Sequence, residues 1–68
     1  MTSTATIEER EEENDRGRMA DCVYATCDES GDSVGPVWGI GDNSRKKALA
    51  MLSEICDCGA NWHKENDE

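Results

Sequence analysis

The feature that most constrains this chain is the grouping of its sulfur and imidazole side chains. All four cysteines and the single histidine of the 68 residues fall between positions 22 and 63, as Cys22, Cys27, Cys56, Cys58 and His63. Thiolates and imidazole are the ligands of closed structural zinc sites. A chain this short buries a thin core and usually needs a metal, disulfides or a partner to fold. The grouping therefore predicts a domain that zinc completes.

The spacing of these residues favours one ion but leaves the ligand set open. Two pairs, Cys-x4-Cys and Cys-x-Cys, are separated by 28 residues. A regular strand sends Cys22 and Cys27 to opposite faces, whereas Cys56 and Cys58 share a face if extended. We therefore expect a site of Cys27, Cys56 and Cys58 with either Cys22 or His63. Four protein ligands would leave no position for a catalytic water, so the site would be structural.

Two other states of the cysteines remain open, namely reduced buried thiols and disulfides. The chain has no apolar run near the roughly 20 residues that span a bilayer, and its start lacks the features of a secretory signal. This pattern predicts a cytoplasmic protein, and a reducing compartment favours metal ligands or redox thiols over disulfides. Cys56 and Cys58 could form a redox pair, although such pairs more often read Cys-x-x-Cys at the start of a helix.

The charge of the chain argues against several partners. Sixteen acidic residues against seven basic ones give a formal net charge of −9. Such a surface repels nucleic-acid phosphates and anionic lipids, so we expect no membrane contact and no generic nucleic-acid binding. The acidity fits a solubilising tail or a halophilic protein in a salty cytoplasm. Arg45, Lys46 and Lys47 are either a solvated face or a local contact for a partner, protein or nucleic acid.

The order of the segments predicts a small domain after an acidic tail. Residues 1–19 contain Ile7 as their only large apolar side chain before Met19, so we expect them to be disordered. Two β-prone runs, 22–27 and 34–40, flank a polar connector and predict a hairpin. Pro36 has no N–H for a ladder, so the second strand is expected at an edge or with a bulge.

A helix is the most regular element that the sequence predicts. Apolar residues recur at helical spacing over 45–55, after Ser44 as a candidate N-cap, and residues 60–63 predict a short third strand. We therefore expect an α+β domain over 20–64, a β-β-α-β unit with the helix packed on a short antiparallel sheet, and an acidic end over 65–68. The expected core comprises Leu49, Leu52, Ile55, Val23, Val37 and one tryptophan.

The acidic composition, the two cysteine groups and Cys58-Gly59 resemble the very short zinc-finger-type proteins of haloarchaea. The resemblance covers residues 22–63. Those proteins usually carry C-P-x-C-G knuckles, whereas Cys56-Asp-Cys-Gly lacks the proline and one spacer residue. The resemblance implies an interaction or regulatory module.

The sequence contains no recognisable catalytic motif. It has no nucleophile elbow and no phosphate-binding loop, and a single histidine limits proton transfer. We therefore predict a non-enzymatic, zinc-stabilised adaptor or regulatory module that binds another macromolecule, most simply a protein, as a monomer or weak dimer. Two alternatives stay open: a thiol redox protein using Cys56 and Cys58, and a metal-free structural domain.

Overall fold

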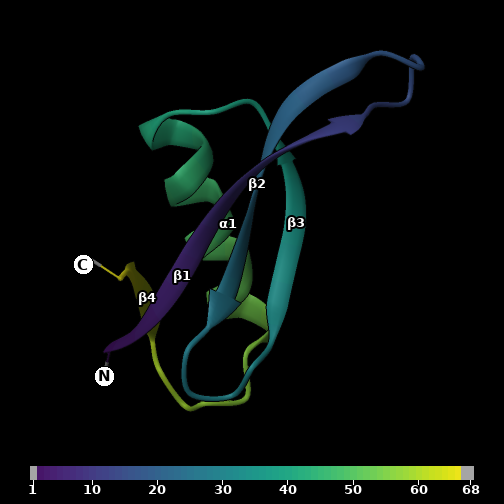
Figure 1. Cartoon of the computed structure of the whole chain (residues 1–68). Coiled ribbons are helices and arrows are strands. Elements are labelled where there is room, and N and C mark those ends of the chain that lie inside the picture. Colours follow the sequence, from purple (N-terminus) through teal and green to yellow (C-terminus); the bar gives the residue numbers. More distant parts are fainter. Residues whose placement is uncertain (1, 67–68) are drawn as a thin grey trace.

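The computed structural model describes residues 2–66. They form a four-stranded sheet with one helix packed across it (Figure 1). The elements are β1 (Thr2–Glu13), β2 (Met19–Cys27), β3 (Ser33–Trp38), α1 (Asp42–Ile55) and β4 (Trp62–Glu65). The strand order is β3-β2-β1-β4. β4 runs parallel to β1 and the other neighbours are antiparallel, so the sheet is mixed. The predicted small α+β fold is confirmed, with one strand more than expected.

The additional strand β1 corrects the prediction of a disordered tail over residues 1–19. It pairs with β2 on one side and with β4 on the other. Its first half alternates, with Ser3 and Ala5 buried and Ile7 partly buried against the core. The prediction of disorder rested on the lack of large apolar side chains in this segment. β1 instead buries small side chains and forms backbone hydrogen bonds to a strand on each side. Met1 of the expected tail and residues 67–68 of the expected acidic end lie outside the described residues.

The core lies between the sheet and α1 and consists mostly of small side chains. Leu52, Val23 and Val37 are buried as expected, and Leu49 is partly buried. Ile55 is 55% exposed, however, and Trp38 and Trp62 are 42% and 56% exposed. The strands explain the tryptophans, because side chains alternate between faces. Val37 and His63 point into the domain, so their neighbours Trp38 and Trp62 point away from α1.

The end of α1 positions the cysteine-containing turn that follows it. The helix begins at Asp42 after Gly41, and the expected N-cap of Ser44 is absent because no side chain caps the helix. At the other end the Cys56 N–H donates to the Leu52 carbonyl at 2.9 Å, and Cys56 itself is extended. The helix therefore stops at Ile55 and leaves Cys56 at its end. Within residues 2–66 no helix is long and apolar enough to cross a membrane.

β3 is an edge strand, as Pro36 predicts, and its register with β2 is irregular between Val23 and Ala25. Gly35 lies on this strand next to the ring of Tyr24. A Cβ atom at Gly35 would lie 2.5 Å from Cδ2 of Tyr24, and the residue has a φ of +140°. The strand therefore needs glycine here both for its backbone conformation and for the ring.

We expect Gly35→Ala to destabilise the protein more than Gly31→Ala. A side chain at positive φ costs about 1–3 kcal/mol, and both glycines share this strain, since Gly31 has a φ of +82°. Only Gly35 adds the collision with Tyr24, because a Cβ at Gly31 meets nothing within 4 Å. Urea denaturation of the two variants measures the difference. Equal losses in the free energy of unfolding would contradict the packing of Tyr24 on Gly35.

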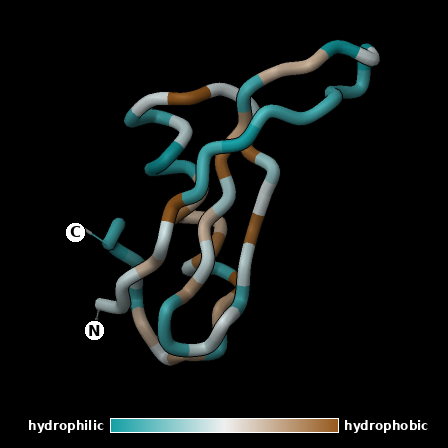
Figure 2. The backbone as a smooth tube through the Cα atoms, viewed as in Figure 1, coloured by the Kyte–Doolittle hydropathy of each residue, from teal (hydrophilic) through white to brown (hydrophobic). Residues whose placement is uncertain are grey.

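The β1–β2 hairpin continues past the rest of the sheet as an arm (residues 11–21). β3 pairs with β2 only from Cys22 onward, so among the described strands none lies beside the pairs from Glu11–Asp21 to Glu13–Met19. Figure 1 shows this arm projecting beyond α1, and Figure 2 shows that it is largely hydrophilic. Asn14 holds its turn, with the Oδ1 atom accepting the N–H groups of Arg16 and Arg18. The acidic run is thus part of an ordered hairpin.

Candidate metal centre

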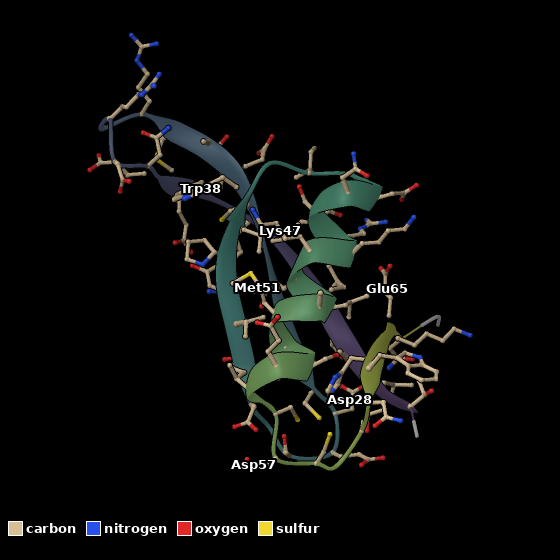
Figure 3. The ribbon with its side chains drawn as sticks, turned by 180° about the vertical axis from the view of Figure 1, so that it is seen from behind. Asp28, Trp38, Lys47, Met51, Asp57 and Glu65 are labelled. Carbon is tan, nitrogen blue, oxygen red and sulfur yellow. The ribbon has the colours of Figure 1, made fainter. Side chains whose placement is uncertain are left out.

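Four of the five candidate ligands converge at the end of the sheet opposite the arm. Cys27 ends β2, Cys56 follows α1, Cys58 lies in the next turn and His63 belongs to β4. One ligand atom from each lies within 4.8 Å of the others. Figure 3 shows sulfur atoms gathered near Asp57 in this region. All four cysteines of the chain are free thiols.

The geometry of this group fits a tetrahedral ion. Zinc binds sulfur at about 2.3 Å and nitrogen at about 2.0–2.1 Å, which places the ligand atoms of a tetrahedral site with three sulfurs and one nitrogen roughly 3.5–3.8 Å apart. The distance from Cys58 Sγ to His63 Nε2 is 3.4 Å. The four ligand atoms all lie within 4.8 Å of one another, so they need to move only slightly closer together to bind one ion. Three thiols and one imidazole are also a usual ligand set for structural zinc.

Ser53 fixes the orientation of His63, which is 5% exposed. The Ser53 hydroxyl donates to the Leu49 carbonyl at 3.0 Å, and the same oxygen lies 2.9 Å from Nδ1 of His63. A hydroxyl has one proton, so the Ser53 oxygen accepts the N–H of Nδ1. In the neutral imidazole Nε2 is then the nitrogen without a proton, and it lies 3.4 Å from Cys58 Sγ. Metal-binding histidines are commonly held in this way.

Ser30 contacts the sulfur atoms of both Cys27 and Cys56. Its N–H donates to Cys27 Sγ at 3.4 Å, and its hydroxyl lies 3.0 Å from Cys56 Sγ. Hydrogen bonding from the side chain and then the N–H of Ser30 lowers the pKa of Cys27 to about 6. Desolvation raises the pKa of Cys56 to about 11. Cys27 therefore ionises first, and negative charge develops where a cation would bind.

Ser3 supports Cys58 from β1. Its hydroxyl lies 3.4 Å from Cys58 Sγ, and the residue is opposite His63 in the β1–β4 register. Sequence reasoning missed Ser3, Ser30 and Ser53, since they share no spacing with one another or with the cysteines. Their positions become meaningful only when the strands and the helix are placed.

Cys22 lies away from this group. The register of β1 with β2 is unbroken from Met19 to Cys27, so side chains alternate along the strand. Cys22 therefore faces the side without the helix, opposite Trp38 of β3, and is fully buried there. Burial raises the pKa of the Cys22 thiol. Of the two candidates for the fourth ligand, the structure places His63 with the other cysteines and Cys22 elsewhere.

The basic residues at the start of α1 do not act as one cluster. Arg45 Nη2 donates to Glu9 Oε1 at 2.9 Å, and its Nε lies 3.9 Å from Glu65. Arg45 thus links the helix to β1 and β4. Lys46 and Lys47 are exposed. Two of the three candidate contact residues therefore remain available on the surface.

No protein-family model, curated protein or solved structure matches this chain. The fold and the site define a small α+β module with three cysteines and one histidine that could hold a metal ion.

Proposed function

We propose that this chain is a zinc-stabilised, non-enzymatic adaptor module. The convergence of Cys27, Cys56, Cys58 and His63 carries the proposal. Three soft sulfurs with one imidazole favour zinc over harder cations. Four protein ligands fill a tetrahedral shell, so the ion has no position for a substrate or a reactive water. The role of zinc here is to stabilise the fold.

The composition of the core explains why a metal would matter. Hydrophobic cores of chains this short rarely supply more than about 3–5 kcal/mol. Structural zinc in finger peptides contributes an apparent binding free energy of about 10–16 kcal/mol at neutral pH. In this chain the ion would join the end of β2, the end of α1, the turn after it and β4. Each of these segments has few large buried side chains of its own.

Native mass spectrometry of the protein purified without a disulfide reductant tests the proposal. We expect the mass of one zinc ion per chain. Replacement by Co²⁺ is expected to give thiolate charge-transfer absorption and the intense visible bands of tetrahedral cobalt. A metal-free protein lighter by two or four hydrogens would instead indicate disulfides, and a metal-free protein of full mass would indicate free thiols. Either result would overturn the zinc site.

Ser53→Ala is expected to weaken zinc binding without abolishing it. The change removes the group that holds Nδ1 of His63, and loss of such partners typically costs about 10–100-fold in metal affinity. Competition against a chromophoric chelator measures the loss. Ser33→Ala, at the exposed start of β3, is the matched control and should keep the original affinity. Equal affinities of the two variants would show that Ser53 does not orient the ligand.

The adaptor part of the proposal is supported by exposed apolar side chains. The exposed fraction is above 40% for five large side chains, namely Met19, Trp38, Ile40, Ile55 and Trp62.

A further inference from the structure

The four ligands of the metal centre form two pairs, and the pairs differ in what they contact. Cys27 and Cys56 share Ser30, whose N–H lies 3.4 Å from Cys27 Sγ and whose hydroxyl oxygen lies 3.0 Å from Cys56 Sγ. Cys58 instead has its sulfur 3.4 Å from Nε2 of His63. The sulfur atoms of Cys27 and Cys56 are therefore close neighbours that contact one and the same residue.

Hydrogen bonds that involve no ligand atom of the site join the two segments that carry this cysteine pair. The Cys27 N–H donates to the Asp32 carbonyl at 2.7 Å, which closes the turn after β2. Oδ2 of Asp32 accepts the Ser30 hydroxyl at 3.0 Å and the Asp57 N–H at 3.3 Å. The Asp32 carboxylate thus connects the turn after β2 to the turn after α1. These bonds keep the two turns together whether or not an ion is bound.

The two cysteines of the pair differ in their access to small molecules. Cys27 is 1% exposed, whereas Cys56 is partly exposed. Peroxides oxidise accessible thiolates to sulfenic acids, and a second thiol beside a sulfenic acid converts it to a disulfide. The sulfur atoms lie at most 4.8 Å apart, and a disulfide brings them to about 2.05 Å, so small movements of the side chains and turns suffice. A disulfide from Cys56 to Cys58 would instead close a tight ring across one residue.

We propose that Cys56 is a site of reversible oxidation by peroxides, and that a disulfide between Cys56 and Cys27 then takes the place of the zinc ion. The Cys56 sulfur attacks a peroxide oxygen, the O–O bond breaks, and a sulfenic acid and, after uptake of a proton, one water form. The Cys27 thiolate attacks the same sulfur, the S–O bond breaks, and the departing hydroxide takes up a proton. The two sulfurs lose the two electrons that the peroxide gains.

The disulfide and the ion join the same parts of the fold, so one can replace the other. Cys27 ends β2 and Cys56 follows α1. Only Cys58 and His63 then remain as ligands, and two ligands do not make a closed zinc site, so the ion leaves. The new bond closes a loop of the chain and restricts the unfolded state. Peroxide would thus change the metal content of the module without unfolding it. The inference rests on the zinc site proposed above.

Peroxide treatment of the full chain tests the exchange. The reduced chain is first loaded with zinc, freed of reductant and then treated with hydrogen peroxide. We expect release of the zinc to a chromophoric chelator and a mass lower by two hydrogens. Trypsin cuts at Arg45, which separates Cys27 from Cys56, so the disulfide appears as two linked peptides. Fragmentation of these peptides should give the pair Cys27–Cys56 about ten times as often as any other pair.

The amide NMR spectrum of the oxidised chain should stay dispersed in excess chelator and collapse when a dithiol reductant is added. Cys58→Ala and Cys56→Ala are the matched variants, because each removes one ligand. With peroxide and chelator, Cys58→Ala should form the disulfide and a dispersed spectrum, whereas Cys56→Ala should form about tenfold less disulfide.

Three results would each overturn the exchange: another pair that dominates in the unaltered chain, a collapsed spectrum of the oxidised chain, or equal disulfide yields in the two variants. The zinc content before peroxide is added reports on the proposed function separately. A chain without zinc at that stage fails the proposed function and the exchange together. A chain that holds zinc and then gives one of the three results fails the exchange alone.

Discussion

Removal of the metal by excess chelator under reducing conditions is expected to unfold the domain. The free energy of metal binding becomes folding free energy, because the unfolded chain has no formed site. The buried core contains Leu52 and Val23 as its largest hydrocarbon side chains, and neither tryptophan contributes to it. A loss of about 10 kcal/mol or more exceeds what such a core supplies. Amide NMR spectra should collapse to a narrow range and recover when zinc is added.

Two cysteine variants sharpen this experiment. Cys27→Ser removes a thiolate at the centre of the group, so the variant should resemble the chelated protein even with zinc present. Cys22→Ala removes a thiol of equal burial on the other face of β2, and it should keep one zinc ion and a folded spectrum. Sharp, dispersed resonances in chelator, or loss of zinc from both variants, would contradict the assigned ligand set.

Deletion of residues 1–18, which leaves Met19 as the first residue, is expected to abolish folding. The deletion removes β1, which within residues 2–66 is the only sheet partner of β4 and one of the two neighbours of β2. It also removes Ser3, which contacts Cys58. A disordered tail could be deleted without loss, so the two interpretations predict opposite results. A truncated chain that still binds zinc and gives dispersed amide resonances would contradict the strand.

A pair of substitutions tests β1 without truncation. Ala5 is fully buried beneath α1, whereas its neighbour Thr4 points to the open face and is exposed. Ala5→Glu would bury an unpaired carboxylate, which is among the most destabilising single changes. Thr4→Glu should be tolerated. Circular dichroism of both variants measures the difference, and similar spectra would contradict the assigned face of the strand.

The sequence predicted the fold where local patterns were strong. The helix was recognisable from its apolar spacing, and Pro36 correctly placed β3 at an edge. The sequence did not predict β1, because serine, alanine and threonine give only a weak alternation of apolar and polar side chains in its first half. In the arm both faces of the hairpin meet solvent, so that half of the strand has no such alternation. Long-range pairing decides such a strand. The pairing of Ser3 with His63 in the β1–β4 register brings together residues that no local pattern relates.

The sequence predicted the kind of site, but it did not determine which residues are its four ligands. The clustered cysteines indicated a soft-ligand site, and strand alternation indicated that Cys22 and Cys27 would not share a face. The choice between Cys22 and His63 required the complete register of β2 and the return of the chain in β4. The supporting serines could not be identified from the sequence, because hydrogen-bond partners of ligands follow no fixed spacing.

The parallel pairing of β1 with β4 has a consequence for biosynthesis. Thr2 is aligned with Trp62, so β1 gains its second neighbour in the sheet only after residues 62–65 have left the ribosome. Until then the hairpin presents one unsatisfied backbone edge, which invites pairing with other nascent chains. Its glutamate-rich half gives such chains a strong mutual repulsion. Acidity along β1 thus protects a polypeptide whose sheet closes last.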